Sequence, residues 1–225
     1  MKSRTKAWSL IAIILVSCIV MAYVDAVIRP NYAVKSVIKM LLFLTLPIGY
    51  ALMGGGVPFR KLFNFEKKGL LASLLLGAGV FAFILASYAL IGPLFDFSRV
   101  TGALQQHIGV NAGNFVFVAI YISFVNSLLE EFFFRGFAFF TLKDQVGRTF
   151  AYLFSAGAFA VYHIAMMTSW FTLPLFLLLI ASLFIAGLLF NWLNERNGNI
   201  YASWMVHLCA NLAINTIGFI LFDII

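Results

Sequence analysis

The chain has 225 residues and a net charge of +7, and its composition differs from that of a soluble protein. Apolar residues make up 63% of it and charged residues 10%, against about 45–50% and about 25% in soluble globular domains. The composition therefore predicts an all-α, polytopic membrane helix bundle. The positive charge does not indicate nucleic-acid binding, because the basic residues form short clusters between apolar runs, as the positive-inside rule produces.

Seven apolar runs are long enough to cross a membrane, which takes about 20 residues per helix. The last run is also long enough for an eighth, short or broken helix. We expect one integral-membrane domain over residues 1–225, with the first span retained as a signal anchor because no small-x-small cleavage site follows it. The predicted spans cover residues 8–28, 34–55, 69–93, 114–139, 149–168, 172–193 and 199–222.

Lysine and arginine lie mainly on one side of these spans. The positive-inside rule therefore places the N-terminus in the cytoplasm. The small size and the high Phe and Ile content favour a bacterial plasma-membrane protein. The inside segments hold Lys2, Arg4, Lys6, Arg60, Lys61, Lys67, Lys68, Lys143, Arg148 and Arg196, whereas the outside segments hold Arg29, Lys35 and Arg99.

Several polar residues of the spans have purely structural explanations. Asp25 and Asp223 lie near predicted outer ends, where the interface would solvate them. Lys39 can extend its ammonium to the outer surface. Cys18 and Cys209 fall inside apolar runs, so we interpret them as small buried residues.

Five further ionisable residues lie deep inside the fourth, fifth and seventh spans. Such residues are functional candidates by default and face the bundle interior or a water-filled cavity. An alternative is that they only join the helices, because buried charged networks also serve specificity. The five are Glu130, Glu131, Arg135, His163 and His207.

Helical spacing assigns different surroundings to the two glutamates. Glu131 and Arg135 are four residues apart, share a helix face and can pair. Glu130 points about 100° away, which leaves it without this cation and available as a general base. Asn126 precedes Glu130 by four residues and can hydrogen-bond to it. Ser127 is expected to bond back to its own helix.

His163, His207 and Asn211 can reach the same layer of the membrane as Glu130. Rises of about 1.5 Å per residue place Glu130 and both histidines near mid-membrane, in a pocket that would open to the cytoplasm. Glu130 and His163 could activate a water, and His207 and Asn211 could donate to an oxyanion.

A metal-bound water is the competing version of this chemistry. One Glu and two His form a known zinc set, which here would be Glu130, His163 and His207. The spacing of these residues does not choose between a metal-bound water and a water activated by Glu and His.

Three motifs, in order on the fourth, fifth and seventh spans, resemble the CPBP (CAAX protease and bacteriocin-processing, or Abi) family of intramembrane endopeptidases. The motifs are Glu-Glu-x-x-x-Arg at 130–135, Phe-x-x-x-His at 159–163 and His-x-x-x-Asn at 207–211. The resemblance covers about residues 114–222. It implies hydrolysis of a peptide bond in a membrane-associated protein or in a lipidated or hydrophobic peptide.

The resemblance also implies the roles of the residues. Glu130 would be the base, His163 its assistant, and His207 and Asn211 the oxyanion site. Glu131 and Arg135 would support them. The family has been described both as metal-dependent and as metal-free, and we favour the metal-free version.

Two other classes of function fit the same polar pocket. Some members of the family are linked to bacteriocin immunity or to regulation of partner membrane proteins, without catalysis. A transporter or proton channel also uses Glu and His at mid-depth, although no inverted repeat is visible. Loss of effect in a Glu130→Gln variant would favour catalysis, and ion flux that depends on Glu130 would favour transport.

Overall fold

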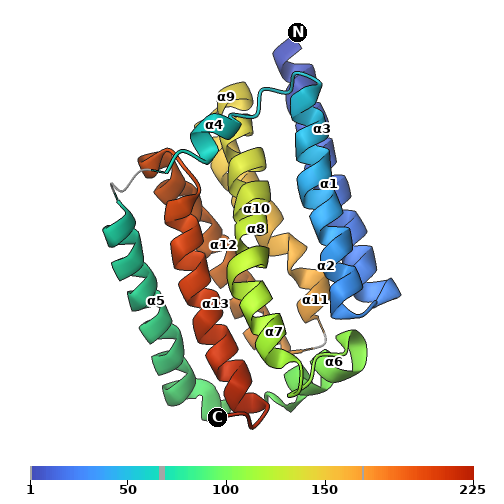
Figure 1. The fold of residues 1–225 in the computed structure, drawn as a ribbon, viewed down its shortest axis with the longest axis vertical. Coiled ribbons are helices and arrows are strands. Elements are labelled where there is room, and N and C mark those ends of the chain that lie inside the picture. Colours follow the sequence, from blue (N-terminus) through green and yellow to red (C-terminus); the bar gives the residue numbers. More distant parts are fainter. Residues whose placement is uncertain (1, 66–68, 169) are drawn as a thin grey trace.

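The computed structural model describes residues 2–65, 69–168 and 170–225 and shows a bundle of membrane-length helices (Figure 1). Among these residues there are seven candidate spans and no strand. The all-α fold class and the seven spans are confirmed, and the described residues contain no eighth span.

Five of the spans are built from more than one helical segment or end in a short continuation. The first comprises α1 (Lys2–Tyr23) and η1 (Val24–Ile28) and the second α2 (Tyr32–Met40), η2 (Leu41–Thr45) and α3 (Leu46–Leu52). The third comprises α5 (Leu70–Ile91) and η3 (Gly92–Leu94). The remaining spans are α7 (Phe115–Ile120), η4 (Tyr121–Asn126), α8 (Ser127–Glu130), η5 (Glu131–Phe140) and α9 (Thr141–Val146); α10 (Arg148–Tyr162) and α11 (Ile164–Met167); α12 (Leu173–Asn197); and α13 (Tyr201–Leu221).

Two short helices mark opposite ends of the bundle. Figure 1 shows α4 (Phe59–Leu62) at the end where the chain starts, and α6 (Ser98–Ile108) at the end where it finishes. The α4 end also carries α9 and those of the predicted inside arginines and lysines that the structure describes. Lys67 and Lys68 lie outside the described residues. Which end faces the cytoplasm stays a prediction.

The fourth span is longer than predicted. It continues to Val146, whereas the sequence analysis ended it at residue 139. Two π-helical stretches, η4 and η5, interrupt the α-helical pattern on either side of α8. Gly147 then stops the helix with a φ of 107°, a backbone conformation that L side chains rarely adopt. Such π-helical departures are frequent at functional sites.

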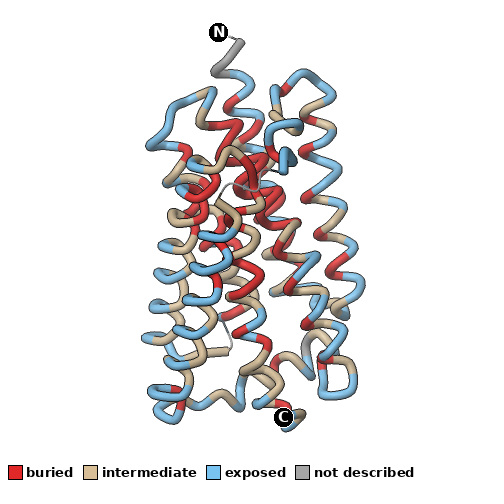
Figure 2. Tube along the Cα trace, turned by 60° about the vertical axis from the view of Figure 1, so that its left-hand side comes forward, coloured by how far each residue is buried: buried red, intermediate tan, exposed pale blue. Residues whose placement is uncertain are grey.

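The core of the bundle is built on phenylalanine. Phe133, Phe134, Phe137 and Phe139, all on η5, are fully buried, and Figure 2 shows buried residues gathered along the middle and at the α4 end of the bundle. Phe43 of η2 stacks on Phe133, with ring centroids 3.9 Å apart and an interplanar angle of 9°. This contact ties the second span to the fourth.

Small residues bring other helices close together. A Cβ added to Gly187 of α12 would lie 2.9 Å from the Cα of Ala156 on α10, and one added to Gly77 of α5 would lie 2.8 Å from Cys209 Sγ on α13. Small residues permit such approach between membrane helices. The two contacts fix α12 and α13, which flank the polar residues, against their neighbours.

Candidate active site

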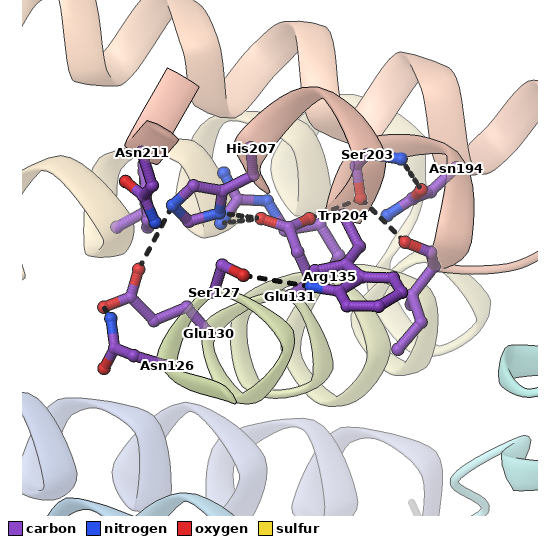
Figure 3. A network of polar contacts seen from close by, with 12 residues as sticks. Asn126, Ser127, Glu130, Glu131, Arg135, Asn194, Ser203, Trp204, His207 and Asn211 are labelled. Atoms are coloured by element: carbon purple, nitrogen blue, oxygen red, sulfur yellow. Dashed lines mark hydrogen bonds and ion pairs between the residues drawn. The ribbon is translucent and has the colours of Figure 1, made fainter. Parts of the chain in front are cut away.

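Glu131 lies in a fully buried polar cluster supplied by α13 and its own helix (Figure 3). His207 Nδ1 is 2.9 Å from Glu131 Oε1, and the hydroxyl of Ser203 donates to Oε2. Arg135 Nη1 is 3.5 Å from Oε1. The pairing with Arg135 predicted from the spacing is therefore confirmed.

The guanidinium of Arg135 is held mainly by aromatic rings. It lies 4.0 Å from the ring centroid of Phe159 and 5.0 Å from that of Phe190. Its nitrogens make no hydrogen bond, so Glu131 and the two ring faces are what compensates its charge. Phe190 also stacks on His207, at 5.4 Å and 22°.

Phe159 connects the second motif to the others. Its ring contacts the guanidinium of Arg135 and meets His163 edge-on at 4.8 Å. It also meets His207 edge-on at 5.9 Å. One aromatic side chain thus packs against a charged or polar member of each of the three motifs.

Glu130 is not free of cations, contrary to the expectation. The ammonium of Lys39, on α2, contacts its Oε1, and both side chains are buried. Asn126 donates to the same oxygen at 3.1 Å, as the spacing predicted, and accepts from Lys39 at 2.6 Å. Oε2 faces His207 Nε2 at 3.6 Å.

Two residues of the N-terminal spans, Lys39 and Asp25, also differ from their predicted surroundings. Lys39 turns into the bundle and is only 4% exposed, so the interpretation that it extends to the surface is wrong. Asp25 is also not left to the interface, because Lys35 Nζ lies 2.5 Å from its Oδ1 and both side chains are buried. In both cases a partner on another segment compensates a charge that lipid would not solvate.

His163 and Asn211 lie at the edge of the cluster, where they are half-buried. His163 caps α10, and its Nδ1 contacts the carbonyl of Phe159 at 2.7 Å. His163 interacts electrostatically with Glu130, although no hydrogen bond joins the two side chains. Asn211 donates to the carbonyl of Ile122 at 3.1 Å.

The hydrogen bonds indicate which ring nitrogens carry protons. A carbonyl or a carboxylate only accepts, so the Nδ1 atoms of His163 and His207 donate to Phe159 and Glu131. A neutral ring then presents an unprotonated Nε2, and a doubly protonated ring donates from it. This assignment follows from the hydrogen-bond partners.

Several members of the site were not predicted from the sequence. Lys39 was assigned elsewhere, and Ser203 and Trp204 were not considered. Trp204 Nε1 donates to Ser127 Oγ at 2.9 Å, and Ser127 donates to the carbonyl of Ser123, its predicted bond. The spacing of Ser203, four residues before His207, was a usable signal, because it puts both on one face of α13.

The residues, as arranged here, do not fit a metal ion. Over the described part of the chain, no three His, Cys, Asp or Glu side chains are placed to hold one. The position that a cation would take at Glu130 Oε1 is filled by the ammonium of Lys39. We therefore derive no step through zinc or another metal.

Comparison with known proteins points to the family that the motifs indicated. Residues 112–213 match a family described as "Type II CAAX prenyl endopeptidase Rce1-like". The searches of curated proteins and of solved structures found no match. All three motifs fall within the matched range, and Lys39 falls outside it. Residues 112–213 are therefore similar to the Rce1-like CAAX endopeptidase family of membrane proteases.

Proposed function

We propose that the protein is an intramembrane endopeptidase in which Glu130 is the general base on water. The observation that carries this proposal is the placement of Glu130 Oε2, which faces His207 Nε2 at 3.6 Å within the family-matched part of the bundle. Oε1 is already engaged by Lys39 and Asn126. A water placed between Oε2 and the histidines would donate a hydrogen bond to Oε2, the oxygen of Glu130 that Lys39 and Asn126 do not contact.

The reaction would proceed by addition and collapse. Glu130 Oε2 takes a proton from the water, and the water oxygen bonds to the carbonyl carbon of the scissile peptide. The carbonyl oxygen becomes an oxyanion, the C–N bond then breaks, and the proton on Glu130 passes to the leaving amine. In its neutral form, His163 would accept a hydrogen bond from the water through Nε2 and so hold it in place.

His207 and Asn211 are proposed as the oxyanion donors. The amide of Asn211 carries two N–H donors, and the one that bonds the carbonyl of Ile122 fixes its orientation. The second donor remains for the substrate. His207 donates from Nε2 in its doubly protonated form, with Nδ1 held by Glu131.

The family match and the location of the site both support a proposal for the substrate class. The family description names a CAAX prenyl endopeptidase, and the charged cluster lies within membrane-spanning helices. We propose a peptide bond near a lipidated or strongly hydrophobic segment, in a CAAX-type protein or in a bacteriocin or pheromone precursor. No metal is part of this proposal.

The test compares cells that carry wild type with cells that carry Glu130→Gln, at matched membrane levels. Mass spectrometry reads the new ends of membrane and secreted peptides. The proposal expects peptide ends that appear only with wild type. Identical sets of ends, with both proteins folded and abundant, would contradict it and would favour a binding or regulatory protein, as in bacteriocin immunity.

A further inference from the structure

The contact between Lys39 and Glu130 joins two parts of the chain that are 91 residues apart. Lys39 belongs to the second span, outside the residues that match the family. Its ammonium is enclosed by Glu130, by the amide oxygen of Asn126 and by the ring of Tyr162, whose centroid is 4.9 Å away. These three partners hold the buried ammonium of Lys39 in place beside Glu130.

The second span is itself fixed against the helix that carries Glu130. Phe43, one turn after Lys39, stacks on Phe133 at 3.9 Å and also meets Phe134 and Tyr162. The backbone that carries Lys39 is therefore packed against η5 at Phe133, two residues after Glu131. Because its backbone is held by this packing, the ammonium of Lys39 can orient the carboxylate of Glu130.

The two oxygens of Glu130 are made unequal by this arrangement. Oε1 accepts from both Lys39 and Asn126, whereas Oε2 accepts no hydrogen bond from the described residues and faces His207 Nε2 at 3.6 Å. A carboxylate that lost its contacts at Oε1 could rotate and present either oxygen, or turn toward the imidazole.

Lys39 also supplies a second cation to the cluster. Glu130 pairs with Lys39 and Glu131 pairs with Arg135, so each carboxylate has a cationic side chain besides the histidines. The family-matched residues alone would bury two carboxylates with one permanent cation, which is a costly arrangement in lipid.

We propose that Lys39 is a positioning residue of the active site, which anchors Glu130 Oε1 and thereby directs Oε2 toward the catalytic water. The active site is then composite: the family-matched helices supply the reacting groups, and the second span supplies the ammonium that orients the base. This inference rests on the proposed function of Glu130.

The test measures kcat and KM separately in proteoliposomes. The probe is a quenched fluorescent peptide with an S-farnesylated cysteine four residues from its C-terminus. The variants are Lys39→Met, Lys39→Arg, Lys35→Met and Glu130→Gln, each checked for folding by thermal unfolding. Lys35→Met is the matched control, because Lys35 lies one turn earlier on the same helix and its buried ammonium pairs with Asp25 instead.

Lys39→Met is expected to lower kcat by about 100-fold, the lower end of what a misplaced general base costs, with KM nearly unchanged. Lys39→Arg keeps the charge and should retain more activity than Lys39→Met, and Lys35→Met should match wild type. The inference would be overturned if folded Lys39→Met kept the wild-type kcat, or if Lys35→Met lowered kcat as much.

A second variant keeps the test decisive if Lys39→Met fails to fold. Asn126→Ala removes the other donor to Oε1 and should lower kcat by about tenfold, the equivalent of one hydrogen bond, with KM unchanged. A wild-type kcat in this variant would overturn the anchoring of Oε1.

Failure of the inference can be told from failure of the proposed function. If Glu130→Gln is inactive and Lys39→Met is fully active, Glu130 remains the base and only the inference is wrong. If Glu130→Gln cleaves as fast as wild type, the proposed function is wrong and the inference falls with it. If wild type does not cleave the farnesylated probe, the same variants are compared on the peptides whose new ends appear in cells only with wild type, and the absence of any such ends contradicts the proposed function.

Discussion

Glu130 and Glu131 are neighbours in the chain, but their carboxylates lie in two different surroundings. Among the described residues, the hydrogen-bond and ion-pair partners of Glu131 lie on the family-matched helices: Ser203 and His207 on α13, and Arg135 on η5. Glu130 takes its cation from Lys39, outside that region, and its other oxygen faces the buried ring of His207 at 3.6 Å. This difference supports the proposal that Glu131 stabilises the site and that Glu130 takes part in the reaction.

The largest expected effect is a loss of stability when the cation that pairs with Glu131 is removed. Arg135→Met would leave a fully buried carboxylate without its permanent cation. Breaking a buried pair in this way costs about 3–5 kcal/mol, so the free energy of unfolding in detergent should fall by that order. Arg148→Met is the matched control, because Arg148 pairs with Glu195 at the surface with 63% of its side chain exposed, and it should change stability little. Equal stabilities for the two variants would contradict the supporting role of Arg135.

Asn211→Ala tests whether Asn211 takes part in the reaction proposed for Glu130. Loss of one oxyanion donor lowers kcat by about 100-fold, while KM should stay the same. Asn215→Ala is the control, since Asn215 lies one turn further along α13 and bonds Ala119 and Ser123 instead. A wild-type kcat in Asn211→Ala would remove Asn211 from the reaction.

Ser203→Ala should have the smallest effect. It removes one hydrogen bond to Glu131 and is expected to cost about 1.5 kcal/mol of stability, the low end for a hydrogen bond to a charged group. Activity on the farnesylated probe should stay within a few-fold of wild type. A loss of activity without a loss of stability would move Glu131 from support into the reaction.

Sequence patterns predicted the contacts within one helix and missed those between helices. The spacing of Glu131 and Arg135, and of Asn126 and Glu130, gave the correct pairs because residues four apart share a helix face. The seven spans were also predictable, because each is a long apolar run. The extension of the fourth span to Val146 was not, since Lys143 and Asp144 interrupt the apolar pattern there.

Lys39 shows why the rest could not be predicted. Its depth suggested a side chain that reaches the surface, and nothing near it in sequence is acidic. Its partner is fixed by the packing of α2 and η2 against the fourth span, through Phe43 and Phe133. A contact of this kind depends on which helix faces which, and hydrophobic periodicity does not report that.

The most direct test of the division between the glutamates compares Glu130→Gln with Glu131→Gln in proteoliposomes. The farnesylated probe and mass spectrometry of its products give activity, and thermal unfolding gives stability. The account predicts that Glu130→Gln abolishes cleavage in a protein that still folds, whereas Glu131→Gln acts mainly by lowering stability and retains measurable cleavage in its folded fraction. A well-folded Glu131→Gln without activity, beside an active Glu130→Gln, would contradict the account.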